Sequence, residues 1–572
     1  MTAGAATEGV AHEFTPKLLT VYRAGYGLAG LRADVLAGLT VAIVAIPLSM
    51  AIAIASGANP AQGLFTAIVG GFLISALGGS RYQIGGPAGA FIVLVSGVIA
   101  KHGYDGFLIA TIMAGLMLLV VGYMRLGVYI KYIPHPVVVG FTAGIGGGAF
   151  SSQIKELLGL TLAREPGELI PKVAALWGAR ETFNPSAIAI SALSLALILG
   201  LRAWKPRWPG LLIAIAVAAS AATLLHLPVE TIGSRYGAIP SSLPAPHLPS
   251  FTLTGLIELV PAAAMIAMLG GVESLLSAVV ADGMTGSRHR SNCELVAQGY
   301  ANIASALFGG LCATGTIART ATNIRSGAIG PMAGIFHAIF VLAILFVAAP
   351  LVAYVPLAAL AALLALGSWN MVEKAEIARL FRGDRAEAMV LLVTFLLTIF
   401  RDLSEGIAAG VTLGAIVFMH RMASAVQVTT DAQTEGGPEG QKRENDDKEI
   451  VVYRIAGPFF FGAASQVAQT LKRVGRAPRV YILDLSFVPM VDATAAHELE
   501  GFVESARRAG AQVFLAGVLS PVLRTLLRAG FDRRTVRVFS DVASARAAAG
   551  GQSEEDGSSA QTEARAKGRP TT

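Results

Sequence analysis

Two long stretches of this chain contain no charged side chain. No Asp, Glu, Lys or Arg occurs over residues 35–80 or over residues 326–372. A helix that crosses the hydrocarbon core of a bilayer needs about 20 apolar residues at a rise of 1.5 Å per residue. Each stretch can therefore hold two spanning helices, with a turn at Asn59 and Pro60 in the first and between Pro350 and Pro356 in the second. We expect a polytopic α-helical membrane protein.

The composition agrees with lipid as the solvent. Only 14% of the residues are charged and 54% are hydrophobic, whereas soluble domains carry about 25% charged residues. Two cysteines exclude a disulfide framework and a cysteine-rich zinc module. The net charge of +7 comes from short basic clusters between apolar stretches. That pattern is typical of cytoplasmic membrane loops rather than of a nucleic-acid partner.

The apolar runs predict fourteen membrane segments. Their approximate ranges are 35–56, 62–79, 86–100, 106–124, 134–153, 185–201, 209–226, 256–283, 292–308, 314–326, 331–350, 355–371, 387–401 and 404–420. Alternate loops are rich in Lys and Arg, which favours a cytoplasmic N-terminus. The loop 154–184 is an exception, because it mixes basic and acidic residues. An even number of segments then places the C-terminus in the cytoplasm as well. Residues 1–20 lack the long apolar core of a cleavable signal peptide.

The composition changes after Arg421. Residues 431–449 are rich in Asp and Glu and contain Gly-Gly-Pro at 436–438, which predicts a flexible linker. Strand-like runs then alternate with helical patterns, which indicates a small α/β domain with a largely parallel sheet. The strands are expected at 450–455, 480–485 and 512–515, and the helices at about 464–475, 494–509 and 521–529. The expected organisation is a cytoplasmic N-terminal segment 1–30, a transmembrane domain 31–425, an acidic linker 426–448, an α/β domain 449–548 and a disordered tail 549–572.

The third and tenth segments are short and begin with glycine-rich sequence. One opens with GGPAGA at 85–90 and the other with GGLCATGT at 309–316. Such openings predict extended backbone that leads into half-helices, which mark the midplane site of many transporters. Free N–H groups and the positive ends of the helix dipoles would favour an anion there. Close helix packing through glycine is the alternative.

Two charged residues fall inside predicted segments. Glu273 lies about 13 Å along a helix from Asp282, and Arg319 follows an uncharged stretch, 295–318. An ionisable side chain in the membrane is a functional hypothesis by default. Arg319 would bind an oxyanion through charge-assisted hydrogen bonds. Glu273 would take up a proton and so remove its repulsion of the anion, which suits proton–anion symport. A structural Glu–Arg pair is the alternative.

Several longer motifs resemble the sulfate permease (SulP) anion transporter family. They are ADVLAGLTVAIVAIPLSMAIAIASG at 33–57, SRYQIGGPAGAF at 80–91, GGVESLLSAVVADGMTGSRHR at 270–290 and SNCELVAQGYANIASALFGGLCATGTIARTATNIRSG at 291–327. PFFFGAA at 458–464 and ILDLSFVPMVDATA at 482–495 resemble the family's STAS domain. The resemblance covers roughly residues 15–545, and the bacterial C4-dicarboxylate transporter type is the most similar within the family. It implies two inverted repeats of seven segments, with core segments 1–4 and 8–11, gate segments 5–7 and 12–14, and half-helices 3 and 10.

The resemblance also implies site residues. Arg319 matches the arginine that faces the anion, and the backbone of five residues would line the anion site: Ala88, Gly89, Ala90, Thr316 and Ile317. Pro47 and Ser49 would form part of its wall. Glu273 and Ser277 stand where sodium-coupled bicarbonate members carry an Asp and a Thr that bind sodium, so a sodium ion at these two residues is an alternative to a proton. Cys312 replaces a proline of many members and is expected to be a small buried core residue.

Four other polar positions carry weaker expectations. His337 in segment 11 is expected to be a packed, hydrogen-bonded histidine, and His289 a solvated topology signal. His135 is expected to be structural, and Asp282 to cap a helix or pair with Arg288. In the STAS-like domain, Ala493 stands where regulatory members carry a phosphorylated serine, so phosphorylation would have to use Thr494. A docking and dimer-supporting domain is the simpler expectation.

The expected function is secondary active anion transport by alternating access, with no enzymatic activity and no cofactor. The coupling ion is expected to be a proton, and the substrate a C4-dicarboxylate, sulfate or bicarbonate. The partners are then a small anion, the coupling ion, the lipid of a bacterial inner membrane and a second copy of the chain. Sodium-coupled bicarbonate symport, anion exchange and a channel remain open. From another class, so does a membrane-anchored STAS regulatory scaffold.

Overall fold

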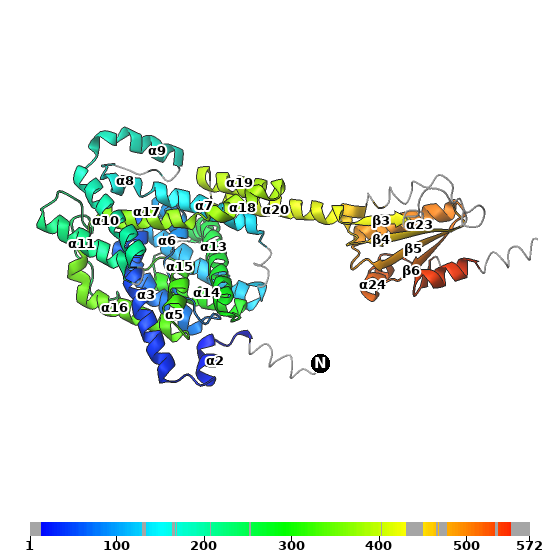
Figure 1. The fold of residues 1–572 in the computed structure, drawn as a ribbon, viewed down its shortest axis with the longest axis horizontal. Helices are drawn as coiled ribbons and strands as arrows, with labels where there is room; N and C mark the ends of the chain where they lie inside the picture. The colour runs from blue at the N-terminus through cyan, green and yellow to red at the C-terminus, as the bar shows by residue number, and fades with distance from the viewer. Residues whose placement is uncertain are drawn as a thin grey trace, which may run out of the picture. The chain divides into compact units, whose positions relative to one another are not determined.

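The computed structural model describes residues 13–550 apart from 128–132, 163–165, 167–168, 206–207, 251–252, 402, 431–449, 465–466, 468–477 and 532–535. The chain divides into two compact units, Met1–Gly414 and Ala415–Thr572, which are described separately (Figure 1). Most of the predicted linker and tail lies outside the described residues.

The first unit is a bundle of apolar helices. Its first half contains α3 (Leu28–Ala55), α4 (Pro60–Phe65), a π-helical turn (Thr66–Gly70), α5 (Gly71–Leu77), β1 (Gly85–Gly86), a 3-10 turn (Gly89–Phe91), α6 (Ile92–Tyr123), α7 (His135–Ser151), α10 (Pro185–Trp204) and α11 (Gly210–Leu224). Gly103 interrupts α6 with a φ of 73°, so α6 supplies both the third and the fourth predicted segment. Asn59 caps α4 through its side chain, as expected for the turn before a second span.

The second half of this unit contains α13 (Leu253–Thr285), α14 (Ser291–Leu307), β2 (Thr314–Gly315), α15 (Ile317–Arg325), α16 (Met332–Val352), α17 (Leu357–Met371), α19 (Arg385–Phe400) and the start of α20 (Leu403–Ser424). Every one of the fourteen predicted ranges thus coincides with helix. Among the described residues, eight helical stretches are long and apolar enough to cross a membrane. How many segments cross, and the inverted repeat, stay predictions.

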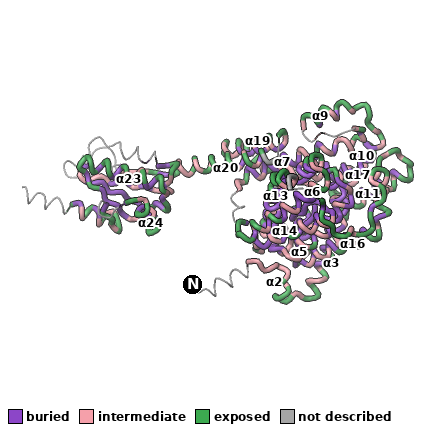
Figure 2. Tube along the Cα trace, turned by 180° about the vertical axis from the view of Figure 1, so that it is seen from behind, coloured by how far each residue is buried: buried purple, intermediate pink, exposed green. Residues whose placement is uncertain are grey.

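The structure also has short helices that the apolar runs did not predict, one before α3 and the others between the long helices. They are α2 (Lys17–Arg23), α8 (Ile154–Leu158), α9 (Leu169–Gly178), α12 (Ile232–Tyr236) and α18 (Lys374–Arg382). The helices α2, α9 and α18 have 7, 10 and 9 residues and are too short to span a bilayer. Figure 2 shows that α9 is largely exposed, whereas buried residues concentrate at the centre of the bundle.

The long helices pack in two sets. In the first set, α14 and α13 lie along α6, α16 lies along α3, and α13 also contacts α15. In the second set, α7 packs against α17 and α19, and α10 against α11 and α17. Contacts of α17 and α11 with α3 join the sets. The functional division into a core and a gate stays a prediction.

The second unit holds a five-stranded sheet in the order β3–β4–β5–β6–β7. Its elements are β3 (Gln427–Thr430), β4 (Ile450–Ala456), β5 (Val480–Phe487), α23 (Ala493–Arg508), β6 (Gln512–Ala516), α24 (Ser520–Arg528) and β7 (Arg537–Phe539). The three predicted strands and the helices at 494–509 and 521–529 are confirmed. The helix predicted at 464–475 lies mostly outside the described residues.

Strand alternation explains how both faces of this sheet are covered. Tyr481 and Leu483 of β5 join the core under α23 and α24, while Val480 and Ile482 face the other side, where Ala545 of the helical stretch 542–550 packs. Two strands of this sheet, β3 and β7, were not predicted. The sequence analysis assigned residues 426–430 to the acidic linker, but 427–430 form β3, which pairs antiparallel with β4. The β-branched residues of this segment favour a strand once a neighbouring strand is present.

Candidate functional site

A two-stranded ribbon brings the third and tenth segments together. Gly85 pairs with Gly315 and Gly86 with Thr314 in antiparallel register. A helical segment follows each strand at once: the 3-10 turn after Ala88, and α15 after Thr316. The first N–H groups of a helix have no partner inside the helix. The ribbon therefore sets two helix N-termini side by side, which is an arrangement that favours an anion.

The five predicted lining residues lie at these two N-termini. Ala88, Ala90 and Thr316 are at most 8% exposed, whereas Ile317 is 38% exposed. The structure therefore brings the backbone of both half-helix starts together, as expected, and Ile317 and Ala318 at the start of α15 are exposed.

Arg319 lies one turn into α15 and is buried, with 2% exposure. Its Nη2 donates to Ser49 Oγ at 3.1 Å and to the carbonyl oxygen of Pro87 at 3.2 Å. Its Nε and Nη1 have no hydrogen-bond partner in the described part of the chain. A guanidinium in this state has two donor groups that match the geometry of a planar oxyanion.

The first membrane helix supplies a wall beside this guanidinium. Ser49 of α3 is fully buried, and its hydroxyl donates to the carbonyl oxygen of Ala45 at 2.7 Å while accepting from Arg319. Pro47 lies buried in the same turn of α3. The structure thus places Ser49 at the arginine and Pro47 two residues away from that contact.

Glu273 and Ser277 lie one turn apart on α13. The Ser277 hydroxyl is 3.1 Å from Thr320 Oγ1, which in turn accepts from the N–H of Ile84 at 3.2 Å. Ser277 therefore links α13 to α15 and, through Thr320, to the residue that precedes β1. Glu273 Oε2 is buried and lacks a hydrogen-bond partner among the described residues.

The alternative of a structural Glu–Arg pair does not agree with this geometry. Glu273 and Arg319 act on each other electrostatically, yet no ion pair within 4.0 Å joins them in the described residues. The two side chains therefore have no direct ion pair with each other, and Glu273 Oε2, Arg319 Nε and Arg319 Nη1 lack hydrogen-bond partners among the described residues.

A buried acid that the sequence analysis did not single out lies beside this site. Glu294 of α14 is 0% exposed. Its Oε2 accepts from the N–H of Ser80 at 3.0 Å, and its Oε1 from Gln298 Nε2 at 3.1 Å and from Ser274 Oγ at 3.4 Å. Ser274 follows Glu273 directly and accepts from Gln83 Nε2 at 2.7 Å. This network joins the chain before half-helix 3 to α13 and α14.

Glu294 lies near the start of the predicted segment 292–308, close to Arg288 and Arg290, and the sequence analysis gave it no role. Its hydrogen-bond partner Ser80 is 214 residues away in the chain, and no local spacing could reveal that contact.

His337 of α16 differs from its expectation. It is buried as predicted, with 0% exposure, but neither ring nitrogen has a hydrogen-bond partner within the described ranges. The ring faces α5, because its Cε1 lies 3.8 Å from the position of a Cβ at Gly71. The prediction that His337 is packed is therefore confirmed, and the prediction that it is hydrogen-bonded is wrong.

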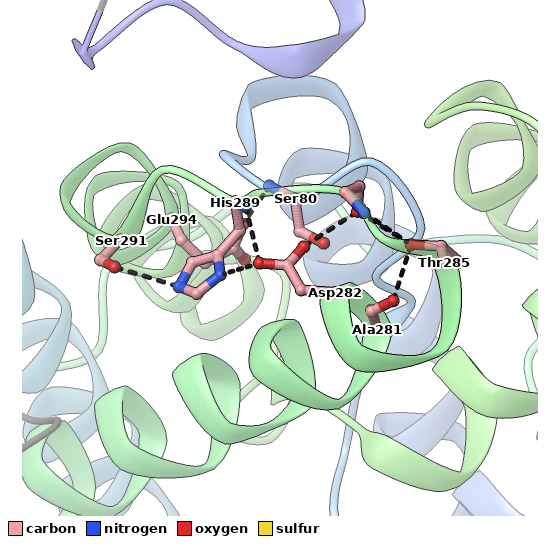
Figure 3. Close-up of polar contacts among 8 residues, drawn as sticks. Ser80, Ala281, Asp282, Thr285, His289, Ser291 and Glu294 are labelled. Carbon is pink, nitrogen blue, oxygen red and sulfur yellow. Dashed lines mark hydrogen bonds and ion pairs between the residues drawn. The ribbon is translucent and has the colours of Figure 1, made fainter.

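The C-terminal end of α13 carries a second polar cluster (Figure 3). Asp282 Oδ2 lies 2.7 Å from His289 Nδ1 and accepts from the N–H of His289 at 2.9 Å, and His289 Nε2 lies 3.0 Å from Ser291 Oγ. The predicted solvated His289 is wrong, since its side chain is 11% exposed. The predicted pairing of Asp282 with Arg288 is likewise replaced by this pair with His289. The cluster closes the loop between α13 and α14.

The remaining expectations concern Cys312, His135 and the STAS-like domain. Cys312 is 1% exposed and lies in the hydrophobic core, as predicted. His135 is the first residue of α7 and lies 3.9 Å from a carboxylate oxygen of Glu376. Asp492 caps α23 by accepting from the N–H of Ala495 at 2.8 Å and also accepts from that of Phe461. Thr494 is exposed.

The comparisons with known proteins point to one family. A profile of the Sulfate permease family matches residues 31–394, and a STAS domain profile matches residues 441–545. A protein of Bacillus subtilis (strain 168) named "Putative sulfate transporter YvdB" is 41% identical over 508 residues, which cover 88% of this chain and 95% of that protein.

Two solved structures are similar. The transmembrane domain of the cyanobacterial bicarbonate transporter BicA is 30% identical with a TM-score of 0.62, over 67% of this chain and 98% of that one. The murine solute carrier 26 family member A9, an anion transporter, has a TM-score of 0.83 at 18% identity, over 93% of each chain, and supports the fold alone. These three relatives are named for sulfate, bicarbonate or anions, so the likeness to the dicarboxylate type stays a prediction.

Proposed function

This chain belongs to the sulfate permease family and is a transporter rather than an enzyme, and we propose from that premise that it moves an oxyanion by secondary active transport. The observation that carries the proposal is Arg319, a buried guanidinium with two donor nitrogens unpartnered in the described chain, set beside two helix N-termini. Together these groups offer several N–H donors to one small anion in a site of low dielectric.

For the substrate, we propose an oxyanion of the sulfate, bicarbonate or C4-dicarboxylate class. The names of the relatives support sulfate and bicarbonate. The dicarboxylate rests only on the similarity of sequence motifs. The chemistry of the site suits all three, because a guanidinium fork matches planar or tetrahedral oxyanions.

For the coupling ion, we propose a proton bound by Glu273. An unpartnered carboxylate oxygen at the depth of the half-helices repels an anion, and protonation removes that repulsion. Sodium bound by Glu273 and Ser277 is the alternative. The Ser277 hydroxyl already contacts Thr320, so a sodium ion would have to share or displace that contact.

For the transport cycle, we propose alternating access in a fold of fourteen segments arranged as two inverted repeats. Segments 1–4 and 8–11 would form the core that carries the anion site, and segments 5–7 and 12–14 the gate. We further propose a homodimer in the bacterial inner membrane with both termini in the cytoplasm. The STAS domain would support docking and dimer formation.

The test is uptake of labelled sulfate, bicarbonate and succinate into proteoliposomes under an inward proton or sodium gradient, with Arg319→Gln alongside. Proton-driven uptake of at least one of these anions, lost in the variant, is the expected result. Uptake driven by sodium alone would replace the proton with sodium at Glu273. Equal uptake by wild type and Arg319→Gln would overturn the anion site.

A further inference from the structure

One side chain of the second helix set lies directly against the start of half-helix 3. Met371 ends α17, and its Sδ lies 3.7 Å from the position that a Cβ at Gly89 would take. On its other side, the Met371 Cβ lies 3.5 Å from the corresponding position at Gly146 of α7. The thioether therefore lies between α7 and the first residue of half-helix 3. Among the described residues, apart from its neighbours in the chain, no other residue places a heavy atom within 4 Å of the Gly89 position.

We propose that Met371 forms the gate-side wall of the anion site and limits which anions fit there; this inference rests on the proposed transport of an oxyanion. Gly89 has no side chain, and its N–H belongs to the free first turn of the half-helix. An anion held by that N–H and by Arg319 would lie beside Gly89, where the Met371 thioether occupies the space next to the missing side chain.

The chemistry of the contact fits a moving interface. The polar groups proposed to hold the anion belong to α15 and to the start of half-helix 3, and the partners of Arg319 belong to α3 and to Pro87. At this point α17 contributes an unbranched apolar chain with no hydrogen-bond donor. A methionine adapts to irregular gaps through its three rotatable bonds. The two helix sets can therefore separate at this point without breaking a hydrogen bond, while the core keeps the anion.

The surroundings of Met371 also allow its side chain to be substituted. Met371 is only partly buried and packs against the edge of the hydrophobic core. A longer or charged side chain of similar shape can therefore replace it with little repacking, and its new atoms would lie next to the anion.

The test compares Met371→Glu with Met371→Gln in anion uptake. The two side chains have nearly the same shape and differ in charge, and a negative charge beside a bound anion weakens binding about tenfold or more. We expect Met371→Glu to raise KM by at least about tenfold and Met371→Gln to stay within about threefold of wild type. Asn370→Glu is the matched control, because it places the same charge on an exposed position one residue earlier.

The outcomes separate this inference from the proposed function. Equal KM values for Met371→Glu and Met371→Gln, with wild-type uptake intact, would overturn the role of Met371 alone. A wild type that neither takes up nor binds any of the three anions would overturn both. Anion-induced thermal stabilisation in detergent provides a binding measurement for a variant that reconstitutes poorly. In that assay, the protection by sulfate should be weaker for Met371→Glu than for Met371→Gln.

A change in size gives an independent measurement. Met371→Ala should remove the wall over Gly89 and improve competition by succinate relative to sulfate by about threefold or more. An unchanged ratio would show that the thioether does not limit the size of the anion.

Discussion

The guanidinium of Arg319 packs against the backbone of Gly86. A Cβ added to Gly86 would stand 2.1 Å from Arg319 Nη1, a separation that atoms in proteins do not adopt. Gly86 also has a φ of +154°, in a region that other residues rarely adopt. The glycine-rich opening of segment 3 therefore makes room for the charge that comes from segment 10.

Because of this contact, we expect Gly86→Ala to impair anion binding in the same way as a substitution of Arg319. The added methyl group displaces the guanidinium from Ser49 and Pro87, so anion binding should fall by about tenfold or more. Affinity for sulfate or bicarbonate in detergent would measure it. Gly97→Ala is the control, since a Cβ at Gly97 meets nothing within 4 Å. Similar affinities in the two variants would show that Gly86 does not position the arginine.

Arg319→Lys should impair anion uptake although it keeps the positive charge. An ammonium cannot reach Ser49, Pro87 and the anion with the geometry of a planar fork. The loss of charge-assisted hydrogen bonds predicts a KM about 10–100 times higher. Arg325→Lys, an exposed change in the same helix, should leave uptake unaltered. A Lys variant with wild-type KM would reduce the role of Arg319 to its charge.

Glu273→Gln should separate transport from the proton gradient. In the wild type, acid on the side of uptake favours the neutral carboxyl group and hence the anion. The amide is always neutral, so uptake should become independent of an imposed proton gradient while exchange of labelled for unlabelled anion continues. The measurement is the ratio of uptake with and without the gradient, and a preserved ratio would remove Glu273 from coupling.

Glu294→Gln provides the comparison for that experiment. Its carboxylate already accepts three hydrogen bonds, so its loss leaves buried donors unpaired and should destabilise the protein by about 1–3 kcal/mol. We expect a lower thermal midpoint with coupling intact. The opposite result, normal stability with lost coupling, would identify Glu294 as the proton acceptor.

The sequence was sufficient for elements that depend on local pattern. The charge-free stretches predicted the long helices. The glycines at 85–86 and 315 indicated the two interrupted segments, which pair as a two-stranded ribbon in the structure. Arg319 and Glu273 could be found because each is a lone charge within an apolar run.

Contacts between segments that are distant in the chain could not be predicted from local sequence patterns. Ser80 and Glu294, Ser277 and Thr320, and Met371 and Gly89 meet only through the tertiary fold. The strand β3 is too short to have a pattern of its own and depends on pairing with β4. The interpretation of His289 as solvated failed for a different reason: Asp282 is only seven residues away, but the basic residues around His289 were interpreted as a loop exposed to solvent.

His337→Leu should not destabilise the protein. The imidazole is fully buried and neither nitrogen is paired in the described ranges, so an apolar side chain of similar size removes a desolvation cost without losing a bond. We expect an equal or higher thermal midpoint. His337→Asn keeps an unpaired polar group in a larger gap and should lower it. A lower midpoint for the Leu variant would reveal a partner, such as a bound water, that the imidazole needs.

Asp484 should stabilise the STAS domain in a pH-dependent way. Burial acts to raise the pKa of this carboxyl, but hydrogen bonds from the N–H and Oγ of Ser486 and from Arg454 outweigh it and hold the pKa below its ordinary value. The carboxylate is thus bound more tightly in the folded state. Its contribution is complete above the unfolded pKa of about 3.9 and is lost as the pH falls through the lower folded value.

Asp484→Asn tests this at neutral pH, where the contribution is complete. The substitution removes the ion pair of 3.0 Å with Arg454 and should destabilise the domain by about 1–3 kcal/mol. Faster hydrogen exchange in β4 and β5 of the full chain would measure it. Glu504→Gln is the control, because its ion pair with Arg508 is exposed and such pairs contribute little. If both variants exchange like wild type, the hydrogen bonds of Asp484 are offset by its burial, and the lowered pKa does not translate into stability.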